Sequence, residues 1–107
     1  MIQLATYQQL DVVCRDIAYM EANSPALSLF LGSKIRDFKQ KNALHITRLS
    51  NKRNELAKKH CLLDAEEKPM TEMKDGINVY KFINDEHKQL FSNEMLEFMS
   101  LSFQMHA

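Results

Sequence analysis

Residues 34–63 read KIRDFKQKNALHITRLSNKRNELAKKHCLL, and this stretch decides the fold class. It contains neither glycine nor proline, and its alanine, leucine, lysine, arginine and glutamate residues favour a helical backbone. We therefore expect one long helix from Lys34 to about Leu63. At 1.5 Å per residue, a helix of about thirty residues spans roughly 45 Å, which exceeds the width of a compact domain of this size. Part of this helix should protrude or be covered by a second copy of the chain.

A line of residues recurs at every seventh position along the predicted helix. Its members are Ile35, Asn42, Leu49, Leu56 and Leu63. The positions that would complete a coiled-coil seam hold Phe38, His45, Lys52 and Lys59. Only the first of these four is apolar, so a sustained two-stranded coiled coil is not expected. A narrow contact line against the first helix or against a neighbouring chain is expected instead.

Charge is divided along the chain although the formal net charge is zero. Residues 1–33 carry −2, residues 34–59 carry +7 and residues 60–107 carry −5. Five of the central bases follow one another at steps of seven, seven, four and seven and therefore share one helical face. This candidate basic face consists of Lys34, Lys41, Arg48, Lys52 and Lys59.

Two interpretations of this basic face are open. Such a face could follow a phosphate backbone and would then bind nucleic acid in a strongly salt-dependent way. No aromatic residue lies among the lysines and arginines after Phe38, so stacking of nucleobases on this helix is not expected. Alternatively, the bases keep a long exposed helix solvated and pair with acids of residues 64–97, on the same chain or on another copy. The zero net charge favours the second interpretation.

The N-terminal part predicts a helical hairpin. Thr6 and Gln9 form a capping box, and an apolar stripe follows at steps of three and four. That stripe is Leu10, Val13, Cys14, Ile17 and Met20 or Glu21. Ser24 and Pro25 provide an N-cap and a first helical residue for a second helix, whose stripe is Leu27, Phe30, Leu31, Ile35 and Phe38. A kink or a restart is expected at Gly32-Ser33.

The C-terminal part predicts a strand, a helix and a strand. Pro69 ends an acidic connection, and Asp75-Gly76 is a turn before the β-prone residues 77–82. Asn84 can cap a helix that extends to about Phe98. Residues 99–105 alternate apolar and polar side chains, as a half-buried strand does, and their expected mate is residues 77–82. The fold class is thus α+β, mainly α, with residues 1–107 forming a single domain.

Catalysis is not expected. Two glycines leave no room for a phosphate-cradling loop or an oxyanion loop, and the four histidines form no pair at the four-residue spacing of helical metal ligands. Cys14 and Cys61 match no metal or disulfide pattern and are expected to be buried free thiols. We therefore expect no catalytic residue, metal or cofactor. No apolar stretch approaches the ~20 residues needed to cross a bilayer, so a cytoplasmic location away from membranes is expected.

The second half of the chain resembles an uncharacterised family of small tailed-phage proteins. In that family a basic helix leads into a short acidic connection with one proline, then a glycine turn, a Tyr-x-Phe strand and an acidic final helix. The residues that carry the resemblance are Leu56, Lys58, Leu63-Asp64, Lys68-Pro69, Asp75-Gly76, Tyr80, Phe82, Phe91, Glu94 and Glu97-Phe98. They cover about half of the chain. The resemblance implies a viral origin and a role in assembly or in interaction with the host, in whose cytoplasm the protein would then act.

Three functions are compatible with these patterns. The leading one is a non-catalytic interaction protein that binds a protein partner and also itself, as a phage assembly factor or as an inhibitor of a host protein. The first alternative is nucleic-acid binding through the basic helix 34–59. The second is sequestration of a small anionic ligand at a subunit interface where bases from two copies converge.

Overall fold

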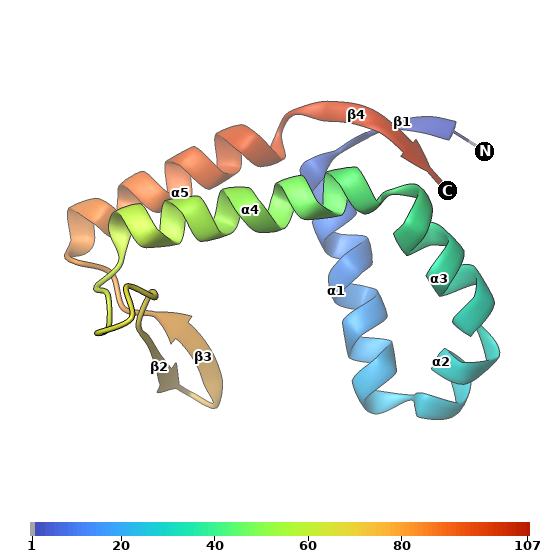
Figure 1. Ribbon diagram of the computed structural model, residues 1–107, viewed down its shortest axis with the longest axis horizontal. Coiled ribbons are helices and arrows are strands. Elements are labelled where there is room, and N and C mark those ends of the chain that lie inside the picture. The colour runs from blue at the N-terminus through green and yellow to red at the C-terminus, as the bar shows by residue number, and fades with distance from the viewer. Residues whose placement is uncertain (1) are drawn as a thin grey trace. The chain divides into compact units, whose positions relative to one another are not determined.

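The computed structural model describes residues 2–107, which form two compact units (Figure 1). Unit 1 contains the described residues up to Leu49 together with Met99–Ala107, and unit 2 contains Ser50–Phe98. In chain order the elements are β1 (Ile2–Thr6), α1 (Tyr7–Asn23), α2 (Pro25–Phe30), α3 (Gly32–Lys41), α4 (Ala43–His60), β2 (Thr71–Lys74), β3 (Ile77–Tyr80), α5 (Asp85–Met99) and β4 (Ser102–His106). The expected mainly helical α+β class is confirmed. That residues 1–107 fold as a single domain stays a prediction.

The sheet of unit 1 joins the two ends of the described chain. Strand β1 pairs antiparallel with β4, and the register runs from Ile2 opposite His106 to Thr6 opposite Ser102 (Figure 1). The alternation expected of a half-buried strand is present in β4, where Phe103 and Met105 are buried, but the strand begins at Ser102 and the expected first residue, Met99, still belongs to α5. The predicted pairing partner of this strand was wrong. Residues 2–6 pair with it, and residues 77–82 do not, because β3 belongs to a separate hairpin.

The predicted start of α1 is confirmed. The Gln9 N–H donates to Thr6 Oγ1 at 3.3 Å, and the Thr6 N–H donates to Gln9 Oε1 at 2.9 Å, which completes the capping box. Leu10, the first member of the predicted apolar stripe, is fully buried. Helix α2 starts at Pro25 as expected, although Ser24 makes no side-chain capping bond. The restart expected at Gly32 is also present, since α3 begins there.

The single long helix over residues 34–63 was wrong. Helix α3 ends at Lys41 and α4 begins at Ala43, with Asn42 at the break. The Asn42 side chain is occupied elsewhere: Nδ2 donates to the carbonyl oxygen of Phe38 at 2.9 Å and to that of His106 at 2.7 Å, and Oδ1 accepts the His106 N–H at 2.9 Å. These hydrogen bonds outweigh the local preference of the segment for an uninterrupted helix. The seven-residue line nevertheless forms a buried row at Asn42, Leu49 and Leu56.

Helix α4 ends at His60, three residues before the predicted end. The chain leaves the helix there because Cys61 forms a β-bridge with Phe82, and Leu63 forms one with Pro69. The Leu62 N–H donates to the Lys81 carbonyl oxygen at 2.9 Å and ties this segment to the end of β3. Backbone hydrogen bonds to a distant segment thus replace the last turn that local propensity favours.

Unit 2 contains the hairpin β2–β3. The predicted turn is confirmed, because Asp75 and Gly76 have φ angles of 54° and 77°, the left-handed conformation of a two-residue hairpin loop. The strand expected over residues 77–82 ends at Tyr80, and its partner β2 was not foreseen. Helix α5 starts as predicted, since the His87 N–H donates to Asn84 Oδ1 at 2.9 Å. Its Phe91 packs on Tyr80 and Phe82, with ring centroids 5.7 and 5.2 Å away.

Replacement of Asn42 by alanine should destabilise the protein by roughly 1–3 kcal/mol, because the His106 N–H and carbonyl lose their side-chain partner. Chemical denaturation measures this loss. Asn54→Ala is the matched control, since Asn54 is an exposed α4 residue and its replacement should change stability by no more than about 0.5 kcal/mol. Unchanged or increased stability of the Asn42 variant would show that the bonds to His106 do not hold the break in place.

Candidate functional site

The five predicted basic residues do not lie on one continuous helix. Lys34 and Lys41 belong to α3, and Arg48, Lys52 and Lys59 belong to α4, with the break at Asn42 between them. The first three are in unit 1 and the last two are in unit 2. That these five residues form a binding face stays a prediction.

Three of these bases form ion pairs with acids. Lys41 Nζ lies 3.0 Å from Asp37 Oδ2, and Lys52 Nζ lies 3.8 Å from Glu55 Oε1. These two acids are neighbours on the same helices. Lys59 Nζ lies 3.4 Å from Oε1 of Glu94 in α5, an acid from the range that the pairing interpretation names. The pairs are solvent-exposed and contribute little stability each, but they lower the positive charge available to a phosphate backbone.

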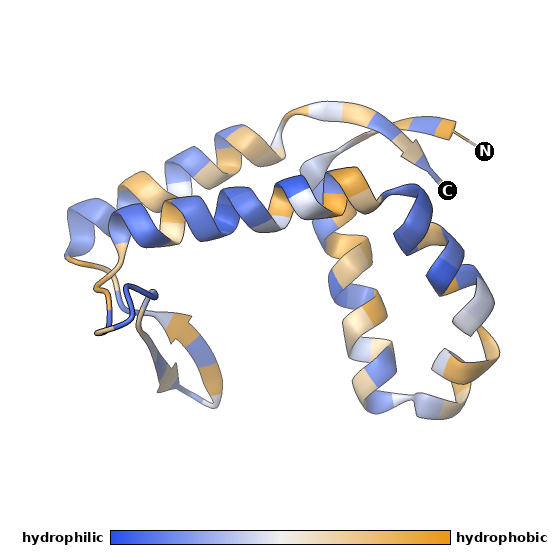
Figure 2. Ribbon diagram, in the orientation of Figure 1, coloured by the Kyte–Doolittle hydropathy of each residue, from blue (hydrophilic) through white to orange (hydrophobic). Residues whose placement is uncertain are grey.

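Helix α2 carries apolar side chains that the other described residues leave largely exposed. It reads PALSLF, and none of its residues is buried. Leu29 is 85% exposed and Phe30 is 83% exposed. Leu27 and, near the end of α1, Tyr19 are exposed as well. Figure 2 shows hydrophobic ribbon in α2, which links α1 to α3 within unit 1. We name Tyr19, Leu27, Leu29 and Phe30 the α2 surface.

This exposure differs from the sequence expectation for the second apolar stripe. Leu31, Ile35 and Phe38 are half-buried, but Leu27 and Phe30 from the same stripe face solvent. Only the part of the predicted stripe from Leu31 onward is therefore partly covered in the structure. Large apolar patches on a protein surface commonly mark sites of protein contact.

A hollow lies between α1 and the part of unit 1 where α3 meets α4. Its volume is about 300 Å³, and its lining is mostly apolar, with Cys14 and Ile17 on one side and Ile46 on the other. The ion pair between Lys39 Nζ and Glu21 Oε1, at 3.2 Å, lies at its polar border. Cys14 is only half-buried, whereas Cys61 is buried as expected, and burial raises the pKa of the Cys61 thiol. Both cysteines are free thiols.

His45 belongs to an aromatic cluster in unit 1. Its Nδ1 lies 2.9 Å from the hydroxyl of Tyr7, and its ring stacks on Phe103 with centroids 4.2 Å apart. Burial lowers the pKa of His45, and the positive charges of Arg48 and His106 lower it further. The neutral imidazole is therefore the form that the folded cluster favours.

His60 is the centre of a second polar network, in unit 2. This side chain is fully buried, and its Nε2 lies 3.3 Å from Glu94 Oε1 while its Nδ1 lies 3.0 Å from His87 Nδ1. Burial opposes the ionisation of Glu94, but hydrogen bonds from His60 and Lys59 and their positive charges outweigh it and lower the pKa of Glu94. Sequence spacing missed this network because its members come from two helices.

The network does not form a metal centre of the usual size. Within residues 2–107, no group of three or more histidine, cysteine, aspartate or glutamate side chains is placed to hold a metal ion. The two nitrogens of His60 point to different partners, so Glu94 and His87 do not converge on one point from its ring. Among the same residues, no helix combines the length and the apolar character needed to cross a membrane.

Known proteins provide no further guide to the site. Comparison of the chain with protein families, with curated proteins and with solved structures finds no match. The exposure and the apolar composition of the α2 surface make it the candidate functional site.

Acidification should reveal the state of His45. Because the pKa of His45 in the folded protein lies below its ordinary value of 6.5, the folded state resists protonation that the unfolded chain accepts. The stability contributed by neutral His45 is therefore present above pH 6.5 and is lost as the pH falls below it. Urea unfolding at pH 7.5 and 5.5 should show a smaller loss for His45→Gln than for the unchanged protein. An equal loss in both proteins would contradict this assignment.

The tautomers of the His60 network follow from its partners. Ionised Glu94 can only accept, so His60 Nε2 must carry a proton, and one proton must lie between the two Nδ1 atoms. Two-dimensional ¹⁵N NMR of the imidazole rings should therefore find a protonated Nε2 on His60 at neutral pH. A bare Nε2 on this ring would be inconsistent with the network.

Proposed function

We propose that this protein is a non-catalytic interaction protein that binds a protein partner through the α2 surface. The observation that supports the proposal is a short apolar helix without a single buried residue. A folded chain gains nothing from holding Leu29 and Phe30 in water, whereas burial of each such side chain stabilises a complex by roughly 1.5–3 kcal/mol. Aromatic residues such as Tyr19 and Phe30 are enriched in protein interfaces.

The proposed partner is a protein of an infected host or another copy of this chain. The resemblance of residues 48–98 to small tailed-phage proteins supports a viral origin, and with it a role as an assembly factor or as an inhibitor of a host protein in the host cytoplasm. Self-association through the α2 surface would also give a homo-oligomer. Both possibilities use the same residues, so one set of variants tests them together.

Nucleic-acid binding through residues 34–59 is a weaker proposal. Three of the five bases on the candidate face are already paired with carboxylates, and the bases are divided between two helices. A protein that binds nucleic acid mainly through phosphate contacts needs several lysine or arginine side chains along one path that are not already paired with acids.

Replacement of Phe30 by glutamate should weaken partner binding about 10- to 100-fold, because a charge replaces an anchor of roughly 1.5–3 kcal/mol. Gln40→Glu is the matched control, since it adds the same charge at an exposed position of unit 1. Self-association is measured by analytical ultracentrifugation over a concentration series. Host partners are captured by a photo-crosslinking amino acid at position 29, with position 40 as the reference. Both variants should unfold at the temperature of the unchanged protein, because both side chains are exposed.

Two results would reject the proposal. One is a monomer at every concentration together with identical crosslinking patterns from positions 29 and 40. The other is an association that Phe30→Glu and Gln40→Glu weaken equally, because overall charge and not the α2 surface would then control it.

A further inference from the structure

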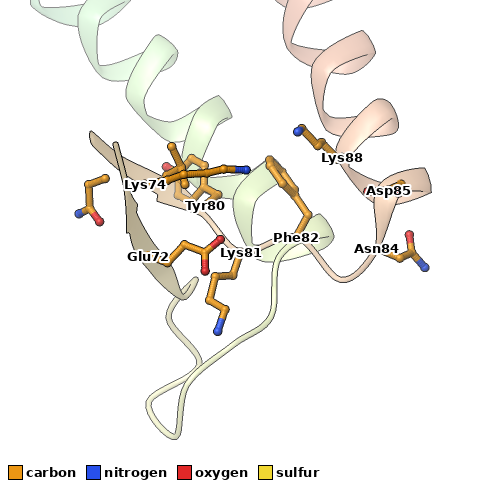
Figure 3. Close-up of a pocket in the computed structure, with 10 residues that line it drawn as sticks. Glu72, Lys74, Tyr80, Lys81, Phe82, Asn84, Asp85 and Lys88 are labelled. Atoms are coloured by element: carbon orange, nitrogen blue, oxygen red, sulfur yellow. The ribbon is translucent and has the colours of Figure 1, made fainter. Parts of the chain in front are cut away.

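Unit 2 contains a pocket that the α2 surface does not involve. It has a volume of about 560 Å³ and is formed by β2, β3, the segment that follows β3 and the first turn of α5 (Figure 3). This volume is within the range of pockets that hold small organic ligands. The side chains that matter for the argument are Lys74, Lys81, Lys88, Val79 and Phe82.

Three lysines from three segments line this one pocket. Lys74 comes from β2, Lys81 follows β3, and Lys88 belongs to α5. Within residues 2–107 none of them forms an ion pair, although Glu72 and Asp85 also line the pocket. The lining therefore carries three positive and two negative charges, and the excess positive charge in this concave site favours an anion placed between the lysines.

The pocket also offers an aromatic surface. Figure 3 shows the side chains of Lys74 and Lys88 extending toward the ring of Phe82. This ring is half-buried and is held from behind by Phe91 at a centroid distance of 5.2 Å. The backbone of Phe82 is fixed by its β-bridge with Cys61. A fixed ring beside two ammonium groups can stack on a planar group while the ammonium groups bind a phosphate.

We propose that this pocket binds a ligand with a phosphate next to a planar ring, which is the chemistry of a nucleotide. Phe82 stacks on the base, and Lys74 and Lys88 bind the phosphate. Lys81, on the same pocket wall, adds positive charge. The site is independent of the proposed protein interface, because its residues are all in unit 2 and the α2 surface is in unit 1.

The test uses the full chain and the four common nucleoside monophosphates as probes, followed by two-dimensional ¹H–¹⁵N NMR at low and moderate salt. At least one of them should shift the amide signals of residues 74, 82 and 88, with weaker binding at the higher salt. Inorganic phosphate and the matching nucleoside are titrated separately. Each should bind at least about tenfold more weakly than the nucleotide, because each offers only half of the proposed contacts.

Variants assign the two halves of the site. Lys74→Gln and Lys88→Gln should each weaken nucleotide binding several-fold, whereas Lys58→Gln, an exposed lysine of the same unit, should leave it unchanged. Phe82→Leu should weaken binding of the nucleotide and the nucleoside but not of phosphate, a difference that mere loss of folding would not produce. A single-stranded 12-mer carrying a 5′ phosphate distinguishes a free nucleotide from a strand end as the natural source.

The proposal is overturned if no nucleotide shifts these signals at millimolar concentration. It is equally overturned if phosphate alone binds as tightly as the nucleotides, or if Lys58→Gln weakens binding as much as Lys88→Gln. None of these results bears on the α2 surface, whose test reads association of proteins.

Discussion

The hydrogen bonds between Asn42 and the backbone of His106 are the constraint on which unit 1 depends. They are made across 64 positions of sequence by one buried side chain, which both donates and accepts. Strand β4 pairs with β1 alone, and a two-stranded sheet is marginally stable in water without further contacts. About 95 residues separate the two strands, so closing that loop costs considerable chain entropy. The side chain at the helix break offsets part of that cost.

The same cluster shows how several weak contacts hold one strand. Phe103 of β4 stacks on His45, and Tyr7 packs on both rings, while the Tyr7 N–H donates to the Leu101 carbonyl oxygen at 3.1 Å. These contacts are made by residues at the junction of β1 and α1 and in the first turn of α4. The position of the Asn42 break therefore sets where His45 lies, and an uninterrupted helix would carry that ring to another place. The interruption at Asn42 between α3 and α4 therefore contributes to the core of unit 1.

Features that depend on neighbours within about four residues could be predicted from the sequence, and features that depend on distant partners could not. The Thr6–Gln9 capping box, the Pro25 helix start, the Asp75-Gly76 turn and the Asn84 cap all follow from the chemistry of short segments. The alternation of residues 99–105 also predicted a half-buried strand, but alternation contains no information about the strand that pairs with it. The break at Asn42 is invisible to helix propensity because its cause lies at His106.

The same distinction between near neighbours and distant partners applies to the charged residues. Spacing alone grouped five bases of residues 34–59, yet three of them have nearby carboxylates that reduce their value as a binding face. The lysines of the unit 2 pocket lie in a part of the chain with a net negative charge, where segment sums give no reason to look for an anion site. What matters to a ligand is whether cations converge in a concave place and outnumber the acids there, as the three lysines of this pocket outnumber Glu72 and Asp85. Lys74, Lys81 and Lys88 meet that condition through the hairpin turn and the start of α5, which bring three separate segments together.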